Sequence, residues 1–589
     1  MAKAAPSVDL AGEGAAGART IARLWRDAVA KPRSGPAYLV ETDDGWHPVE
    51  WQEAARRVDD LAFGLLASGI RKGDTVGIVG RTRLEWSLLD FALALVGAVG
   101  AGVYPTSTAA ECSHLLGHTR AVAVFVEDEE QLRKIDEARA GLPGLEQVFT
   151  FGDLDELERR GRKRRSEAPT ALDDAVAAVS EDDLFTYIFT SGTTGPPRAC
   201  MIRNRNYYEM TSCVDRLGAL VEETDTVLLW LPLAHNFGRL MHLAGPWVGF
   251  TIAFVPDSQR VRDALPQVRP TVLPSAPRLY EKMHAAVRDS FDSATGARRR
   301  LIDWALGVGY ETSRRRQRGD ELPRGLALRH RIADRLVFSK VKERVGGRLR
   351  FGISGAAPLA REIAEFFHAL DILILEGYGQ TECTTACSVN RPDRFKFGTV
   401  GLPLPGFEIR TAEDGEILVR SGTVFAGYLD DDPATAEALP GDGWLRTGDV
   451  GELDEDGFLR ITDRKKDLIV TAGGKNVAPQ NIETALKRAK VIREALVVGD
   501  RRPYLVALIA VDNEEGRMHG TSDGVHAAVA EAVEEVNRAL PRHEQIKRFA
   551  VLPRGFSAER GELTATLKLR RRVVERNFAA EIDALYAGS

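Results

Sequence analysis

The sequence has few of the features that mark secreted, zinc-binding or nucleic-acid-binding proteins. Five cysteines among 589 residues are too few for a disulfide framework, and Cys383 with Cys387 has no second Cys/His pair nearby to complete a zinc site. The formal net charge of −6 argues against a nucleic-acid binder. The first residues are small and acidic, unlike a signal peptide. A reducing, cytoplasmic location fits these absences best.

Long hydrophobic runs are also missing. The most apolar stretch, residues 86–104, contains Asp90 and several glycines, which predicts a buried helix leading into a strand and not a bilayer span. Two basic runs, 159–165 and 298–350, are typical of solvated helix faces, with a surface for anionic lipid or an acidic partner as the alternative. We therefore expect at most peripheral contact with a membrane.

The order of apolar segments indicates an α/β protein. Because single cores stop growing at roughly 250–300 residues, two or more domains are expected. Short apolar runs alternate with helical stretches, the pattern of mostly parallel sheets covered by helices. These predicted strands are 76–79, 122–126, 184–189, 227–233, 252–255, 349–353 and 372–375. Several lead directly into polar loops, and ligands of such sheets bind beyond the strand ends.

The loop after the predicted strand 184–189 has the composition of a phosphate site. It offers small hydroxyl and glycine residues whose backbone amides are open, and Arg198 adds a permanent positive charge. The loop residues are Thr190, Ser191, Gly192, Thr193, Thr194 and Gly195. An ordinary Ser/Thr/Gly surface turn would have the same composition. A simple P-loop NTPase is disfavoured because no GxxxxGK[ST] stretch occurs.

Three further segments supply complementary chemistry. GYGQTE at 377–382 places Tyr378 beside Thr381 and Glu382, which suit purine stacking, phosphate contact and magnesium binding. GWLRTGD at 443–449 ends in Asp449, a carboxylate that suits the two ribose hydroxyls. GELTATLKLRRR at 561–572 carries Lys568 near the end of the chain. Together these segments predict a site for a nucleotide, a metal ion and a cation from a second domain.

The ordered set of motifs resembles the adenylate-forming superfamily, which contains acyl-CoA synthetases, adenylation domains of peptide synthetases and luciferases. The resemblance covers residues 187–568 and, within the superfamily, is greatest to bacterial long-chain fatty acyl-CoA synthetases. The motifs that carry it are SGTTGPPR, LPLAHNFGR, SGAAPL, YGQTE, GWLRTGD, DRKKD and GELTATLK, together with the long basic insert.

A charged, turn-like segment at 463–465 predicts a junction between a large domain over residues 1–463 and a small α+β domain over 464–589, and the resemblance implies that the small domain moves about this hinge. It implies that a fatty carboxylate attacks MgATP to give acyl-AMP and pyrophosphate, after which coenzyme A takes the acyl group and releases AMP. Glu382 would hold Mg²⁺, and Thr381, the loop 190–195 and Arg198 the phosphates. Lys568 would bridge the carboxylate and the α-phosphate.

The remaining roles that the resemblance implies concern the nucleoside, the carboxylate and the thiol. Gly355, Ala356, Ala357 and Tyr378 would line the adenine, while Asp449 and Arg464 would hold the ribose. His235 would lie near the attacking carboxylate, although a histidine before a helix is as often structural. Rotation about the hinge would bring Gly473, Gly474 and Lys475 to the thiol channel, and a tight hairpin turn is the alternative interpretation of that loop.

One departure from the family pattern is visible. The phosphate loop usually ends Pro-Lys-Gly, whereas here Pro197, Arg198 and Ala199 follow one another. Arginine keeps the charge with a different geometry, and alanine disfavours a positive φ, so a rebuilt or strained turn is expected. Two rival functions remain open: a fatty acyl-AMP ligase that loads a carrier protein, and a weakly active or non-catalytic nucleotide-binding homologue.

Overall fold

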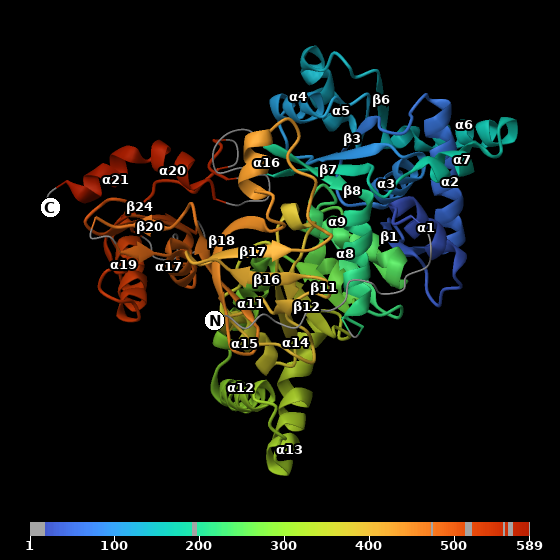
Figure 1. The fold of residues 1–589 in the computed structure, drawn as a ribbon. Coiled ribbons are helices and arrows are strands. Elements are labelled where there is room, and N and C mark those ends of the chain that lie inside the picture. Colours follow the sequence, from blue (N-terminus) through green and yellow to red (C-terminus); the bar gives the residue numbers. More distant parts are fainter. Residues whose placement is uncertain are drawn as a thin grey trace.

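The computed structural model describes residues 18–190, 197–218, 220–472, 475–512, 521–557, 560–563 and 569–587. Two helix-covered sheets form the larger part of the molecule, and a smaller α+β part at the C-terminal end lies beside them (Figure 1). Among the described residues, none of the helices has the length and apolar content needed to span a bilayer.

The first sheet has six strands in the order β6-β5-β3-β4-β7-β8, and only the β7–β8 pair is antiparallel. All five residues of β3 are buried, as expected for a parallel strand covered on both faces. The strands are β3 (Thr75–Val79), β4 (Val99–Val103), β5 (Ala123–Val126), β6 (Gln147–Thr150), β7 (Leu184–Thr190) and β8 (Arg198–Arg203). The helices along this part of the chain are α2 (Trp51–Ala67), α3 (Leu84–Val96), α4 (Ala109–His118), α5 (Glu129–Ala138), α6 (Leu154–Glu167) and α7 (Ala171–Ala178).

The second sheet has nine strands in the order β15-β14-β13-β12-β11-β9-β10-β1-β2, parallel from β13 to β1. Its strands are β1 (Tyr38–Thr42), β2 (Gly45–Val49), β9 (Thr226–Leu229), β10 (Thr251–Phe254), β11 (Val272–Ser275), β12 (Phe351–Ser354), β13 (Leu373–Tyr378), β14 (Ser388–Val389) and β15 (Leu402–Pro403). Helices on this part of the chain are α1 (Ile21–Ala30), α8 (Asn204–Arg216), α9 (Asn236–Val248), α10 (Val261–Val268), α11 (Pro277–Asp292) and α15 (Arg361–Ala369).

Helices of the two sheets pack on each other and bury one ion pair. Arg239 of α9 binds Asp90 of α3, and both side chains are almost completely excluded from solvent. The guanidinium lies between two aromatic rings, 5.1 Å from the Trp86 centroid and 4.8 Å from that of Phe185 in β7. His242 completes the cluster, with its Nε2 atom 3.3 Å from the second Asp90 oxygen. The polar residue that breaks the apolar stretch 86–104 therefore joins the two sheets.

The long basic insert forms helices that project from the rest of the molecule, at the lower edge of Figure 1. It contains α12 (Gly296–Gln317), α13 (Arg324–Ala333), a π-helical turn (Asp334–Phe338) and α14 (Ser339–Arg344). Leu326, Ala333, Val337 and Phe338 face inward and are buried against the second sheet's helices.

The rest of the chain is built from mostly antiparallel strands and from helices, with β23 and β24 as a parallel pair. A four-stranded sheet contains β16 (Glu408–Thr411), β17 (Glu416–Arg420), β18 (Leu445–Leu453) and β19 (Leu459–Arg464), with α16 (Asp432–Ala438) between β17 and β18. After it come β20 (Ile469–Val470), β21 (Asn476–Val477), α17 (Pro479–Leu486), β22 (Ile492–Val498), β23 (Leu505–Val511), α19 (Ser522–Arg538), β24 (Ile546–Val551), α20 (Arg571–Asn577) and α21 (Ala579–Tyr586). The predicted α/β class and the smaller α+β part are confirmed.

Candidate active site

The predicted phosphate loop connects the antiparallel strands β7 and β8. Thr190 and Arg198 are cross-strand partners at the loop end of this hairpin. Residues Ser191, Gly192, Thr193, Thr194 and Gly195 lie outside the described residues. The register nevertheless fixes where the chain leaves β7 at Thr190 and where it enters β8 at Arg198.

Arg198 at the end of this loop belongs to a chain of contacts that reaches Glu382. Its Nε atom lies 3.0 Å from an Asp431 carboxylate oxygen, and its guanidinium carbon lies 5.4 Å from the Tyr428 ring centroid. The Tyr428 hydroxyl donates a hydrogen bond of 2.6 Å to Glu382 Oε1. Burial, with the Glu382 charge beside it, raises the pKa of Tyr428, so this hydroxyl stays a proton donor.

The expected strain at Ala199 is wrong. This residue lies inside β8, pairs with Phe189 and is completely buried. It is absent from the residues with positive φ. An extended strand accepts alanine without cost, so the departure from glycine at this position disturbs no turn.

A second chain of contacts joins Tyr378, Asp449 and Arg464. The Tyr378 hydroxyl donates to Asp449 Oδ2 at 2.7 Å, and Arg464 Nε donates to Asp449 Oδ1 at 3.1 Å. Asp449 and Arg464 are register partners of the antiparallel pair β18–β19, which explains why residues fifteen positions apart meet. Burial, reinforced by the Asp449 charge, raises the pKa of Tyr378.

Carboxylates from both chains of contacts influence the charge of Arg464. The Asp449 carboxylate raises the pKa of this guanidinium most, and the Glu382 carboxylate raises it further. Glu382 follows β13 by four residues in the 3-10 turn Thr381–Cys383, in which Thr381 is buried. The structure therefore brings Arg198, Tyr378, Glu382, Asp449 and Arg464 together from four separate sequence motifs.

The loop after β12 lies against the same strand end. A Cβ atom built on Gly355 would lie 3.4 Å from the Phe237 ring and 3.6 Å from the Gly377 carbonyl oxygen. Ala356 has a φ of +69°, in the left-handed region that alanine rarely adopts, and Ala356 and Ala357 are exposed. The predicted adenine-lining residues 355–357 thus border the strand that carries Tyr378.

His235 has a structural contact of its own. It is the N-cap of α9, and its Nδ1 atom accepts the Phe237 backbone N–H at 3.2 Å. The next residue, Asn236, offers its carbonyl to the Thr385 hydroxyl at 3.1 Å. His235 therefore begins a helix that starts beside the loop following Glu382.

Two predicted elements from the C-terminal part are only partly described. Strands β20 and β21 pair antiparallel around residues 471–475, as a hairpin requires, and the Lys475 backbone N–H donates to Thr471 Oγ1 at 3.2 Å. Gly473, Gly474 and Lys568 lie outside the described residues. The flanking strands are antiparallel neighbours, and both interpretations of the loop between them stay predictions.

Two residues of this region were missed in the motif analysis, Tyr428 and Glu376. Glu376 lies on β13, is almost completely buried, and accepts the Leu359 backbone N–H at 3.2 Å. Its other oxygen has no hydrogen-bond partner among the described residues. Burial raises the pKa of this carboxyl group to about 7. A carboxylate at the end of an apolar run was the available signal for Glu376, whereas no local pattern pairs Tyr428 with Glu382.

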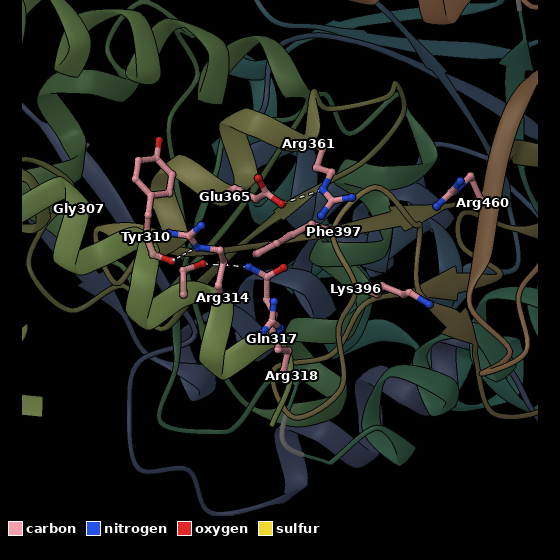
Figure 2. Close-up of a pocket in the computed structure, with 11 residues that line it drawn as sticks. Gly307, Tyr310, Arg314, Gln317, Arg318, Arg361, Glu365, Lys396, Phe397 and Arg460 are labelled. Atoms are coloured by element: carbon pink, nitrogen blue, oxygen red, sulfur yellow. Dashed lines mark hydrogen bonds and ion pairs between the residues drawn. The ribbon is translucent and has the colours of Figure 1, made fainter. Parts of the chain in front are cut away.

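A cavity of about 760 Å³ lies elsewhere, between α12, α15, the segment 396–397 and β19 (Figure 2). None of the predicted site residues that the structure describes lines it. Several of its cations are neutralised: Arg361 pairs with Glu365 at 2.7 Å, Lys396 with Asp454 at 2.6 Å and Arg460 with Glu452 at 3.7 Å. The remaining lining residues are Gly307, Tyr310, Ser313, Arg314, Gln317, Arg318 and Phe397.

No group of three or more His, Cys, Asp or Glu side chains converges on a metal position within the described parts of the chain. Glu382 is a single carboxylate, and only its Oε1 atom accepts the Tyr428 hydroxyl. This arrangement fits Mg²⁺, which proteins often bind through one or two carboxylates together with substrate phosphates and water.

Comparison with known families agrees with this geometry. Residues 25–429 match the family described as AMP-binding enzyme, and residues 466–589 match its C-terminal domain. The chain belongs to this family of adenylate-forming enzymes. A protein of Mycobacterium bovis named long-chain-fatty-acid–CoA ligase FadD15 is 37% identical, over 94% of this chain and 95% of its own. The Xenopus laevis protein named long-chain-fatty-acid–CoA ligase ACSBG2 is 29% identical, over 96% and 84%.

Solved structures share the fold at low sequence identity. The anthranilate CoA ligase AuaEII in complex with anthranoyl-AMP aligns with a TM-score of 0.74 at 19% identity, covering 96% of this chain and 98% of that one. A Mycobacterium tuberculosis fatty acyl CoA synthetase aligns with a TM-score of 0.64 at 20% identity, covering 96% and 99%. Both support the α/β architecture described above.

Proposed function

We propose that the protein is a long-chain fatty acid–CoA ligase of the AMP-forming type. A carboxylate oxygen of the fatty acid attacks the α-phosphorus of ATP, and the bond to pyrophosphate breaks. The thiol of coenzyme A, after losing its proton, then attacks the acyl carbon, and the bond to AMP breaks. The names of the relatives that match nearly the whole chain support the activity, and the convergence of Glu382, Asp449 and Arg464 supports its location.

We assign the nucleoside to Asp449 and Tyr378. Each Asp449 oxygen accepts one bond here, from Tyr378 or from Arg464, and so keeps lone pairs for the two ribose hydroxyls. Tyr378 and the loop 355–357 offer an aromatic face and exposed backbone to the adenine. Arg464 would steady the carboxylate while remaining close to the phosphates.

We assign the triphosphate to the β7–β8 hairpin loop and its metal ion to Glu382. Mg²⁺ would supply charge neutralisation of the phosphates there. Thr190 and Thr381 would add hydroxyl contacts, and Arg198 a cation whose position Asp431 and Tyr428 determine. Phosphoryl transfer depends mainly on such positioning and charge stabilisation. His235, at the start of α9, would border the attacking carboxylate.

Residues of the proposed hinge contact both the large part and the C-terminal part. Asp463 is buried and accepts the Gln480 backbone N–H at 3.0 Å, toward the C-terminal part. Lys465 instead binds Asp414 at 2.7 Å and Glu416 at 2.8 Å, toward the large part. A rotation at 463–465 would move Lys568 away from the nucleotide and bring Gly473, Gly474 and Lys475 toward the thiol.

The C-terminal part also makes separable contacts with the large part. Arg488 binds Glu362 at 3.0 Å, Arg278 binds Glu494 at 3.4 Å, and Lys490 binds Asp289. Exposed pairs of this kind contribute little free energy each, about 0–1 kcal/mol. Such an interface is compatible with the rotation that two half-reactions at one site require.

Free coenzyme A is our preferred acceptor, and a carrier protein the alternative. The purified protein would be incubated with MgATP, fatty acids of increasing length, and either coenzyme A or a holo carrier protein, with products identified by mass. Acyl-CoA and AMP that depend on long-chain acid are the expected products. If the acyl group is transferred only to the carrier protein, the carrier protein and not coenzyme A is the acceptor. If no acid leads to pyrophosphate release, the assignment as an enzyme is wrong.

A cytoplasmic location belongs to the same proposal. All five cysteines are buried and unpaired in disulfides, which suits a reducing compartment.

A further inference from the structure

Helix α13 and the π-helical turn that follows it carry an apolar stripe on the side that faces solvent. The large hydrophobic side chains of the described residues are exposed at only four positions, and three of them are Leu328 at 56%, Ile332 at 43% and Leu336 at 42%. Their i, i+4, i+8 spacing places them on one face, over about 12 Å of helix. The buried residues Leu326, Ala333 and Val337 lie on the opposite face. The helix therefore has two apolar faces: the buried one that an ordinary amphipathic helix has, and the exposed stripe.

The π-helical turn Asp334–Phe338 keeps this stripe continuous. A π turn contains more than four residues, so a side chain four positions along lies almost above the first. Leu336 thus follows Ile332 on the same face although the helix changes its pitch between them. Wide turns of this type often occur at functional sites.

Cations surround the apolar stripe. Residues 324–344 contain seven lysines and arginines against two acidic residues, a local net charge of +5 in a chain whose total is −6. All five of these cations that lie within residues 324–340 are exposed and form no ion pair with any described residue: Arg324, Arg329, Arg331, Arg335 and Lys340. Lys342 nearby is different, because it binds Asp334 at 2.5 Å. We call Leu328, Ile332, Leu336 and these five cations the outer α13 face.

The position of the outer α13 face suits a flat partner. Helices α12 and α13 form the lowest projection of the molecule in Figure 1, so nothing in the rest of the fold would keep α13 from a planar surface. An apolar stripe bordered by arginines is the composition of helices that lie in the interface of an anionic bilayer. A second copy of the chain fits less well, since two such faces would bring like charges together.

We propose that the outer α13 face docks on the surface of a membrane containing anionic lipids. The three aliphatic side chains enter the boundary between headgroups and acyl chains, and the cations contact lipid phosphates. The inference goes beyond the proposed ligase activity and does not require it, because docking is measured without turnover. If both hold, the enzyme would act where fatty acids partition.

The test is vesicle flotation of the full chain and two triple variants. Vesicles would contain about three parts phosphatidylcholine to one part phosphatidylglycerol, with pure phosphatidylcholine as the neutral comparison. The apolar variant is Leu328→Ser, Ile332→Ser, Leu336→Ser, and the charge variant is Arg329→Gln, Arg331→Gln, Arg335→Gln. We expect wild-type binding that requires the anionic lipid and weakens with salt, and a loss of about tenfold or more in either variant.

Matched controls separate docking from general effects. Val470→Ser removes the fourth exposed aliphatic side chain, 44% exposed and on β20, and should leave flotation unchanged. Arg159→Gln, Arg160→Gln, Lys163→Gln removes three cations from α6 and should also have no effect. The replaced side chains are all at the surface, and melting curves of each variant would verify folding.

A second measurement reports insertion directly. Ile332→Cys labelled with an environment-sensitive dye should shift its emission to the blue on anionic vesicles, and Val470→Cys should not. Equal flotation of both triple variants and the wild type would overturn the proposal, as would equal binding to neutral vesicles. Loss of self-association in the variants, with vesicle binding intact, would instead make this face a contact between copies of the chain.

Discussion

Tyr428 connects two side chains that belong to separate sequence motifs. Its ring lies beside the Arg198 guanidinium, and its hydroxyl donates to Glu382. The charge that replaces the family's usual lysine is therefore held by an aromatic ring and a carboxylate. Arg198 occupies this position through contacts for which lysine has neither the planar shape nor the reach.

Removal of the Tyr428 hydroxyl should lower the affinity of the site for Mg²⁺. In Tyr428→Phe, Glu382 loses the donor that orients it, and partners of this kind typically change metal affinity by about 10–100-fold. We expect the Mg²⁺ concentration for half-maximal pyrophosphate release to rise in that range. The matched control is Tyr208→Phe, which removes the hydroxyl from a tyrosine whose ring packs on Trp247. An unchanged Mg²⁺ requirement would remove Tyr428 from the site.

Glu376 should make stability depend on pH. Its pKa is about 7 in the folded state against 4.5 for an unperturbed group, so the folded protein binds this proton more tightly than the unfolded chain. The resulting stabilisation is complete below the unfolded pKa and is lost as pH rises through the folded one. The full difference corresponds to about 3 kcal/mol.

Glu376→Gln removes this ionisation with little change of shape. We expect the variant to melt at a higher temperature than the wild type at about pH 8, with the advantage gone or reversed at about pH 5. Glu413→Gln, at an exposed position, should follow the wild type at both values. Parallel melting curves for wild type and Glu376→Gln would show that the Glu376 proton is not coupled to folding.

The sequence predicted the positions of helices and strands better than it predicted which strands pair. All seven strands predicted for the large domain are present, with ends that differ by a few residues, because parallel buried strands produce continuous apolar runs. The apolar stretch 86–104 is a helix and a strand, as expected. The hairpin β1–β2 was not predicted, since its residues alternate only weakly and much of it is exposed.

In the candidate site, too, the residues were predicted from the sequence but several of their contacts were not. Tyr378, Glu382 and Asp449 were predicted because they follow strands or turns with local composition signals. The Tyr428–Glu382 bond joins residues 46 positions apart, and the Arg239–Asp90 pair joins residues 149 positions apart. Contacts over such separations depend on how sheets stack, which no local pattern encodes. The prediction of strain at Ala199 was wrong for a related reason. Ala199 pairs with Phe189 inside β8, and this long-range pairing gives it an extended backbone.

The buried pair between α3 and α9 should be costly to break. In Arg239→Leu, Asp90 keeps its charge inside the core with His242 as its remaining partner, and such losses typically cost about 3–5 kcal/mol. The double variant Asp90→Leu, Arg239→Leu should lose less than the sum of the single variants. Denaturant unfolding measures these differences.

A surface pair provides the comparison. Arg19, whose side chain is 42% exposed, binds Glu181 at 2.7 Å and also pairs with Glu209, so Arg19→Leu should cost no more than about 2 kcal/mol, about 1 for each surface pair. Equal costs for Arg19→Leu and Arg239→Leu would mean that the Asp90–Arg239 pair does not hold the two sheets together.

The proposed function requires one site between the large part of the molecule and a smaller part that moves relative to it. The residues that we assign to phosphate, metal and ribose belong to the large part and to β19, whereas Lys568 and residues 473–475 belong to the C-terminal part of the sequence. The two half-reactions would then differ in which segment of the smaller part faces the nucleotide.

Lys568→Ala should separate these half-reactions. We expect fatty-acid-dependent pyrophosphate release to be abolished, while thioester formation from supplied acyl-adenylate and coenzyme A continues nearly unchanged. Lys547→Ala, an exposed lysine of the same part, should affect neither. An equal loss of both activities in Lys568→Ala would contradict the exchange of segments between the two steps.

The most direct test of the account follows the carboxylate oxygen. A fatty acid labelled with heavy oxygen in its carboxylate would be converted with MgATP and coenzyme A, and the nucleotide product analysed by mass. Attack on the α-phosphorus predicts AMP that carries one labelled oxygen, because the acyl–oxygen bond breaks in the second step. Unlabelled AMP, or label in ADP or inorganic phosphate, would contradict an acyl-adenylate formed at this site.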